Sequence, residues 1–353
     1  MIEAMTNVLR AHALRWPHMT VQDAVKLVYQ STFGCGHMIR DEASALAWIR
    51  RERAEVAADP TLPLFEKIGG GFMRLHLAAA GELSDELICR MFCATAAHGA
   101  AENASLEENL GLLRRVCADG VFSFSVEELD AYLAGYRRDG CPAVHHSAVY
   151  RDAYAPAYRV VRGEYARLLP LIRAADELLA VKPSAVIAID GCASAGKTTA
   201  AACLRELFGG ATVHMDHFFL PLSLRNPERL AEPGGNVDYD RFVAEVAEPL
   251  KRRTPLAYGV FDCSVMACTH TEAVDPRGLT VVEGSYSLHP KFGDLYDLRV
   301  FLSVSPETQK ARILARNGAD RWPAFRDRWI PMETRYAEAF SIPQSAGLRV
   351  EMD

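Results

Sequence analysis

The stretch GCASAGKT, from Gly191 to Thr198, places two glycines five residues apart and directly before Lys-Thr. It fits the pattern G-x-x-x-x-G-K-[ST], in which the glycines let the backbone turn tightly and approach phosphate oxygens. The apolar run SAVIAID precedes the stretch, and the helix-like run KTTAAACLRELF follows its second glycine. A strand, a glycine-rich loop and a helix in this order are the context that a phosphate-binding loop requires. The sequence therefore predicts a nucleotide-binding loop rather than a simple turn with an exposed lysine.

The residues of this loop have distinct expected tasks. Backbone N–H groups and the start of the helix supply partial positive charge to phosphate oxygens. Lys197 is expected to reach the β- and γ-phosphates of ATP, and Thr198 to offer its hydroxyl to Mg²⁺. ATP and Mg²⁺ are therefore the cofactors that the loop predicts. The expected nucleotide-binding residues are Gly191, Ala193, Ser194, Ala195, Gly196, Lys197, Thr198 and Thr199.

The composition narrows the class of protein. The chain has 353 residues, half of them apolar, which is enough for about two domains with their own cores. A formal net charge of -6 gives no reason to expect a nucleic-acid or anionic-membrane partner. We expect no signal peptide, and no run of about 18 apolar residues predicts a membrane span. The nine cysteines form no CxxC pair, so we expect reduced thiols and a cytoplasmic location.

Residues 1–180 carry the patterns of helices. Thr20 and Ser125 each precede an amphipathic run and are followed three residues later by an acid, which is typical of a helix N-terminus. No convincing strand appears before Pro183, so we expect a mostly α-helical domain over residues 1–180. Its glycine-rich loops, YQSTFGCGHMI and EKIGGGFMRLHL, fit either a small-molecule site or turns that need glycine, and the role of this domain stays open.

Short apolar runs alternate with helical segments after Pro183. The runs are SAVIAID, ATVHMD, LTVVEG and LRVFLSV. This alternation is typical of an α/β domain with a parallel sheet flanked by helices. We place the boundary at VKPS, residues 181–184, and the second domain over residues 181–353.

Two acids stand where these strands end. Asp216 follows the second strand, at the edge of an open α/β sheet where ligands bind, and it could act as a base toward a substrate hydroxyl. Its alternative role is to cap a turn or helix. Glu283 ends a later strand, where a carboxylate can hold Mg²⁺ directly or through water. Asp238 and Asp240 fit either helix caps or ligands of a hydroxyl.

Residues 183–353 resemble the uridine kinase family of P-loop kinases. The matching pieces, in the order of the family, are GCASAGKTT, MDHFFLP, GNVDYDRF, FDC, VVEGSYSLHP and SPETQKARILARNG. The resemblance implies transfer of the γ-phosphoryl group of ATP to a primary hydroxyl of a small molecule, typically the 5′-hydroxyl of a nucleoside.

The resemblance also implies roles for individual residues. Asp216 takes the place of the aspartate that accepts the hydroxyl proton, and Glu283 that of the acid near the metal. Arg312 and Arg316 lie on the helix that leads into the lid of the family and are expected to act with Lys197 in catalysis. The residues implied to bind the substrate are Phe219, Asp238, Phe261 and Asp262.

The sequence also departs from the family. His217 stands where the family has a small polar residue, and CSVMACTH replaces the segment that contacts the base. Two alternatives to a nucleoside kinase therefore stay open. One is a kinase for another hydroxyl, pantothenate-like or on a sugar phosphate, and the other is a nucleotide-binding regulator. We expect a small-molecule partner and leave open whether the chain forms a homo-oligomer.

Overall fold

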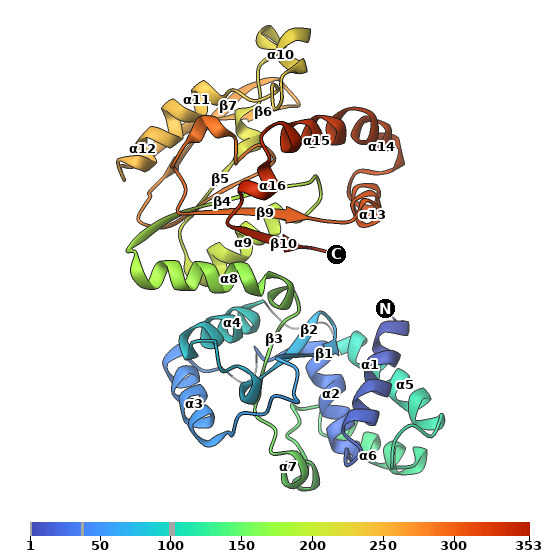
Figure 1. Cartoon of the computed structure of the whole chain (residues 1–353). Helices are drawn as coiled ribbons and strands as arrows, with labels where there is room; N and C mark the ends of the chain where they lie inside the picture. Colours follow the sequence, from blue (N-terminus) through green and yellow to red (C-terminus); the bar gives the residue numbers. More distant parts are fainter. Residues whose placement is uncertain (1, 37–38, 99–102) are drawn as a thin grey trace. The chain divides into compact units, whose positions relative to one another are not determined.

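The computed structural model describes residues 2–36, 39–98 and 103–353 (Figure 1). The chain forms two compact units, Met1–Ala166 and Arg167–Asp353, which are described separately below. The division lies near the start of helix α8 (Glu164–Val181), whereas the sequence placed the boundary at residues 181–184. Every helix in the described part of the chain is too short or too polar to cross a membrane.

The first unit is mostly helical, as expected. Two of its helices begin at the predicted caps: the Asp23 carboxylate accepts a hydrogen bond from the Thr20 backbone N–H, and Ser125 and Glu128 cap each other's backbone N–H groups. Such side chains satisfy N–H groups that have no partner within the helix. The helices are α1 (Ile2–Arg15), α2 (Val21–Phe33), α3 (Glu42–Glu55), α4 (Asp85–Ala97), α5 (Asn103–Ala118), α6 (Val126–Arg138) and α7 (Ala148–Tyr154).

A three-stranded antiparallel sheet also belongs to this unit, so the expectation of no strand before Pro183 is wrong. The strands are β1 (Phe65–Gly69), β2 (Phe72–His76) and β3 (Tyr158–Arg162), paired in that order. Each has only five residues, and β2 buries the charged side chain of Arg74 at its centre. A buried charge interrupts the apolar pattern by which strands are recognised, and the glycines of EKIGGGF form the turn between β1 and β2.

The second unit is an α/β domain with a five-stranded parallel sheet. The strand order is β10-β9-β4-β8-β5, and all four pairs are parallel. Four of the strands fall on the predicted runs. The fifth, β10, was not predicted, because it has only four residues and two of them are charged. The bounds are β4 (Ser184–Gly191), β5 (Ala211–His214), β8 (Gly278–Glu283), β9 (Leu298–Ser303) and β10 (Leu348–Glu351).

Helices cover both faces of this sheet (Figure 1). Helix α9 (Lys197–Phe208) contacts β4, β5 and β8 on one face. On the other face, one apolar cluster joins side chains of the sheet, such as Val213 and Val282, to α11, α12, α15 and α16 and to a two-stranded sheet. That sheet pairs β6 (Leu256–Asp262) with β7 (Ala267–Val274). The remaining helices are α10 (Pro227–Ala231), α11 (Tyr239–Phe242), α12 (Glu248–Lys251), α13 (Pro306–Asn317), α14 (Trp322–Ala324), α15 (Ile330–Ala339) and α16 (Ile342–Ser345).

Two adjacent glycines after α9 allow a matched test of this packing. Both have positive φ, but a Cβ at Gly210 would lie 1.9 Å from the carbonyl oxygen of Leu279, whereas a Cβ at Gly209 would meet nothing within 4 Å. We expect Gly210→Ala to lower the free energy of unfolding by about 2–4 kcal/mol, because backbone must move to relieve the overlap. Gly209→Ala should cost only about 1–2 kcal/mol, for the strain of a side chain at positive φ without the overlap. Urea denaturation of both variants measures the difference, and equal losses would contradict this account.

Candidate functional site

The predicted loop lies between the end of β4 and the start of α9. Gly191, the last residue of β4, has φ of 148°, and a Cβ there would lie 2.1 Å from the carbonyl oxygen of Leu302 on the neighbouring strand β9. Gly196 precedes α9 with φ of 92°. At Gly191, only glycine suits both the positive φ and the close approach of the neighbouring backbone. The central strand and the helix thus fix both ends of the loop.

Lys197 folds back onto the loop. Its Nζ donates to the carbonyl oxygens of Gly191 and Cys192, each at 2.9 Å. Carbonyl oxygens are weaker partners for an ammonium group than phosphate oxygens, which carry full charge. The side chain is therefore held close to the loop by contacts that a phosphate can replace.

Thr198 and Glu283 come from α9 and from the end of β8, and the structure brings them together. The Thr198 hydroxyl donates to Glu283 Oε1 at 3.1 Å, although 85 residues separate the two. A hydroxyl beside a carboxylate suits Mg²⁺, which takes few protein ligands and keeps several waters. Within the described ranges, no group of three or more His, Cys, Asp or Glu side chains is placed to hold a metal ion.

His214 is a member of this group that the sequence analysis missed. Its Nδ1 lies 2.6 Å from Glu283 Oε1, and this hydrogen bond raises the pKa of His214. The imidazole thus shares Glu283 Oε1 with the Thr198 hydroxyl and helps to orient the carboxylate. The signal available in the sequence was its position at the end of β5, two residues before Asp216.

Asp216 lies just beyond β5, in a short 3₁₀ turn (Met215–Phe218). Its side chain keeps an exposed edge, but the protein around it removes water and raises the pKa of its carboxyl, and the nearby charge of Glu283 raises it further. The charges of Lys197 and Arg316 act in the opposite direction. Asp216 therefore lies close enough to Lys197, Glu283 and Arg316 for their charges to shift the pKa of its carboxyl.

Arg312 and Arg316 differ in their surroundings, although both lie on α13. Arg312 donates to the carbonyl oxygen of Ser194 in the loop at 3.4 Å and also to that of Met352. Arg316 is exposed, and its Nε donates to the side chain of the adjacent Asn317 at 3.0 Å. Arg312 thus contacts the loop backbone, and Arg316 is the one whose charge reaches Asp216.

The residues predicted to bind the substrate make structural contacts. Asp238 caps α11 by accepting from the Arg241 backbone N–H at 3.1 Å, and Asp262 accepts from the backbone N–H and hydroxyl of Ser264 in the turn between β6 and β7. Phe261 is 5% exposed, and Phe219 packs against the apolar cluster. None of these contacts involves Asp216.

His217, the residue after Asp216, lies near Glu272 on β7. The Tyr258 hydroxyl donates to Glu272 Oε2 at 2.6 Å, and His217 Nδ1 lies 4.0 Å from the same oxygen. Burial lowers the pKa of His217, and the nearby His214 lowers it further, so this imidazole is neutral at pH 7. The neighbouring cation Arg241 is occupied, because it donates to the carbonyl oxygens of Gly259 and His217.

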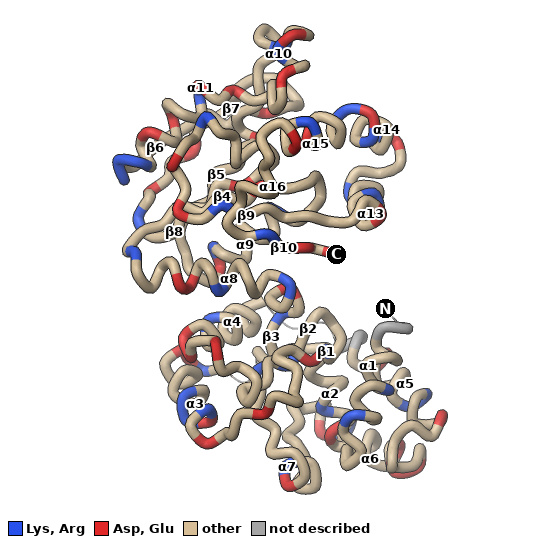
Figure 2. The backbone as a smooth tube through the Cα atoms, viewed as in Figure 1, with Lys and Arg blue, Asp and Glu red and all other residues tan. Residues whose placement is uncertain are grey.

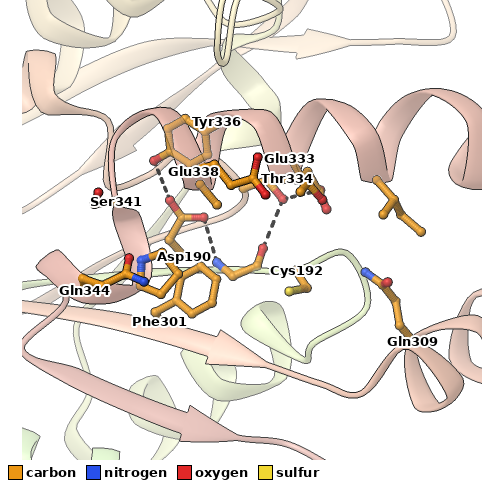
Figure 3. A pocket seen from close by; sticks show the side chains of 15 residues that line it. Asp190, Cys192, Phe301, Gln309, Glu333, Thr334, Tyr336, Glu338, Ser341 and Gln344 are labelled. Atoms are coloured by element: carbon orange, nitrogen blue, oxygen red, sulfur yellow. Dashed lines mark hydrogen bonds between the residues drawn. The ribbon is translucent and has the colours of Figure 1, made fainter.

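Behind the loop, a buried acid joins four segments. Asp190, the residue before Gly191, accepts from the backbone N–H groups of Gly191 (2.7 Å), Tyr286 (3.2 Å) and Leu288 (3.0 Å) and from the Tyr336 hydroxyl (2.8 Å). Figure 3 shows Asp190 beneath α15, with Tyr336 above it. In the sequence, Asp190 is recognisable only as the end of the apolar run SAVIAID.

Glu333 on α15 is a second acid that the sequence analysis missed. It accepts from the backbone N–H of Ala193 in the loop at 2.9 Å and from the Ser285 hydroxyl at 2.7 Å. Together with Asp190 and Cys192 it lines a pocket of about 510 Å³ between the loop and α15 (Figure 3). Nothing in the sequence between residues 193 and 333 indicates that these two segments meet.

Comparisons with known proteins give weak likenesses. No family model matches the chain. A structure described as a "Possible Uridine Kinase" from Bacillus stearothermophilus aligns at 18% identity over 53% of this chain and 98% of its own length, with a TM-score of 0.39. A "putative fructose transport system kinase" from Silicibacter sp. TM1040 aligns at 21% identity over 50% of this chain and 97% of its own, also at 0.39. A structure of JCV helicase aligns at 14% identity over 94% of this chain and 84% of its own length, with a TM-score of 0.26. These TM-scores are too low to carry an argument, so function is argued from the residues of the site.

The Thr198–Glu283 pair predicts a specific response to magnesium. In Glu283→Gln the charge is lost while the shape is kept, so we expect the Mg²⁺ concentration needed for nucleotide binding to rise about 10–100-fold. Titration of Mg²⁺ at fixed ATP, followed by calorimetry, measures this. The control is Glu248→Gln, which removes a surface acid paired with Arg252. An unchanged magnesium requirement in Glu283→Gln would show that this carboxylate does not serve the metal.

Proposed function

We propose that this chain is an ATP-dependent phosphotransferase that transfers the γ-phosphoryl group to a hydroxyl of a small molecule, with nucleosides as the first class of acceptor. One observation carries the proposal: Lys197, the Thr198–Glu283 pair and Asp216 lie at the same edge of the sheet. A lysine for phosphates, a hydroxyl–carboxylate pair for Mg²⁺ and a base for the acceptor are the parts that phosphoryl transfer to an alcohol requires.

Each group has a defined task in this proposal. Lys197 leaves the carbonyl oxygens of the loop and pairs with the β- and γ-phosphates, while backbone N–H groups cradle them. Bound Mg²⁺ would neutralise charge on the phosphate oxygens. Asp216 orients the acceptor hydroxyl and receives its proton, and the raised pKa of its carboxyl suits a base that works near neutral pH. Arg316, exposed on α13, is free to move toward the phosphates.

The surroundings of Asp216 support an uncharged acceptor. Glu283 adds a second carboxylate whose charge reaches Asp216, and Arg241 donates its hydrogen bonds to backbone carbonyls. A phosphate or carboxylate on the acceptor would meet repulsion from these acids, since Lys197 and Arg316, the cations whose charges reach Asp216, are engaged with the phosphates of ATP in this proposal. This favours a nucleoside or another neutral hydroxyl compound over the sugar-phosphate and pantothenate-like alternatives.

A nucleotide-binding regulator is the remaining alternative, and Asp216 argues against it. A regulator needs the loop and the acid near the metal, but it has no use for a base beside the γ-phosphate. The position of Asp216, within reach of the charges of Lys197 and Glu283, favours an enzyme.

The proposal is tested by measuring ATP consumption over a panel of nucleosides, neutral sugars, sugar phosphates and pantothenate. We expect turnover with a neutral hydroxyl compound and its loss in Lys197→Ala, because that lysine stabilises the transferred phosphoryl group. Circular dichroism should show that Lys197→Ala keeps its fold, since the hydrogen bonds of its Nζ go to carbonyl oxygens of the loop itself. ATP consumption by this variant at the wild-type rate would refute the proposal.

Asp216→Asn separates the base from the nucleotide site. The amide keeps the size of the side chain but cannot take a proton, so kcat should fall about 10²–10⁴-fold while ATP affinity stays the same. Because the pKa of Asp216 is raised, wild-type activity should be lost as the pH falls, and at a higher pH than an ordinary aspartate would give. A pH–rate profile that keeps this acid limb in Asp216→Asn would assign the base to another group.

A further inference from the structure

Glu333 connects the helix after α13 and α14 to the nucleotide loop. Its two carboxylate oxygens are used separately: Oε2 accepts from the Ala193 N–H, and Oε1 accepts from the Ser285 hydroxyl. Ala193 is the third residue of the loop, and Ser285 follows β8. A carboxylate on α15 thus holds two segments that surround the phosphate site.

The charge balance around Glu333 depends on Lys197. Burial raises the pKa of the Glu333 carboxyl, and the negative charge of Asp190 raises it further. The positive charge of Lys197 lowers this pKa. The other titratable groups that face it are Cys192 in the loop and Tyr286 after β8, both neutral because burial raises their pKa values. Lys197 is the cation that balances the carboxylate while the lysine rests on the loop.

Binding of a nucleotide changes this balance. Lys197 turns toward the phosphates, and a group with several negative charges arrives on the other side of the loop. The carboxylate then loses its balancing cation and gains repulsion in a site with little water. Protonation relieves the repulsion without breaking the tether: Oε2 still accepts from Ala193, and a protonated Oε1 donates to the Ser285 hydroxyl, which can accept.

We infer that Glu333 is a positioning residue that tethers the nucleotide loop to α15 and takes up a proton from solvent when MgATP binds. The inference rests on the proposed function only in that the loop binds a nucleotide. It gives α15 two separable effects on the site: the hydrogen bonds hold the loop in place, and the charge opposes the phosphates.

Two variants separate the tether from the charge. Glu333→Gln can keep both hydrogen bonds, because its amide oxygen accepts from Ala193 and its amide nitrogen donates to the Ser285 hydroxyl. It should bind MgATP about three- to tenfold more tightly, since the repulsion is gone. Glu333→Ala loses the bonds to Ala193 in the loop and to Ser285 after β8, and it should bind MgATP about tenfold more weakly. The control is Glu338→Gln, an exposed acid on the same helix that lines the same pocket.

Proton uptake is measured by isothermal titration calorimetry of the full chain with MgATP, in buffers of different ionisation enthalpy at the same pH. The wild type and Glu338→Gln should take up a fraction of a proton on binding, and Glu333→Gln should take up less. Equal uptake in the wild type and Glu333→Gln, or weaker binding in Glu333→Gln, overturns the inference while leaving the proposed function intact. A wild type that binds no MgATP overturns both.

Discussion

The four hydrogen bonds to the buried carboxylate of Asp190 hold the second unit together at its functional edge. They join the end of β4, the turn after β8 and the helix α15, which lies 146 residues further along the chain. A carboxylate with so little contact with water is tolerated only when donors surround it. The same donors fix the point from which the nucleotide loop begins, so the geometry of Lys197 and Thr198 depends on this one side chain. In Figure 2 the acidic and basic residues of this unit are spread along its backbone.

The sequence predicted the parts of the site that follow from local patterns. GCASAGKT gave the strand, the loop and the helix, because glycine spacing and apolar periodicity are local properties. The ends of β5 and β8 gave Asp216 and Glu283, since parallel strands bring their carboxyl ends to one edge. The meeting of Thr198 with Glu283 agrees with that expectation. The roles assigned to these residues remain proposals.

What the sequence could not give depends on contacts between distant segments. The link from Glu333 to Ala193 requires knowledge of where α15 packs, and no period or motif carries that information. In the first unit, Arg74 lies fully buried in a strand and bonds to Gln30 on α2. A charge in the core is stabilised by partners that only the folded chain supplies, so a pattern based on apolar residues passes over it.

The central place of β4 in the sheet affects how binding energy is used. β4 is paired on both sides, with β8 and β9, and the loop that leaves it is held at both ends. Such a loop loses little conformational entropy when phosphates bind, so little of the free energy of the nucleotide contacts is lost to ordering the loop. The neighbouring hairpin of β6 and β7 has only two strands, and most of β7 is exposed. The inner strand β6 nevertheless packs into the apolar cluster, so this hairpin is also held in place before any substrate arrives.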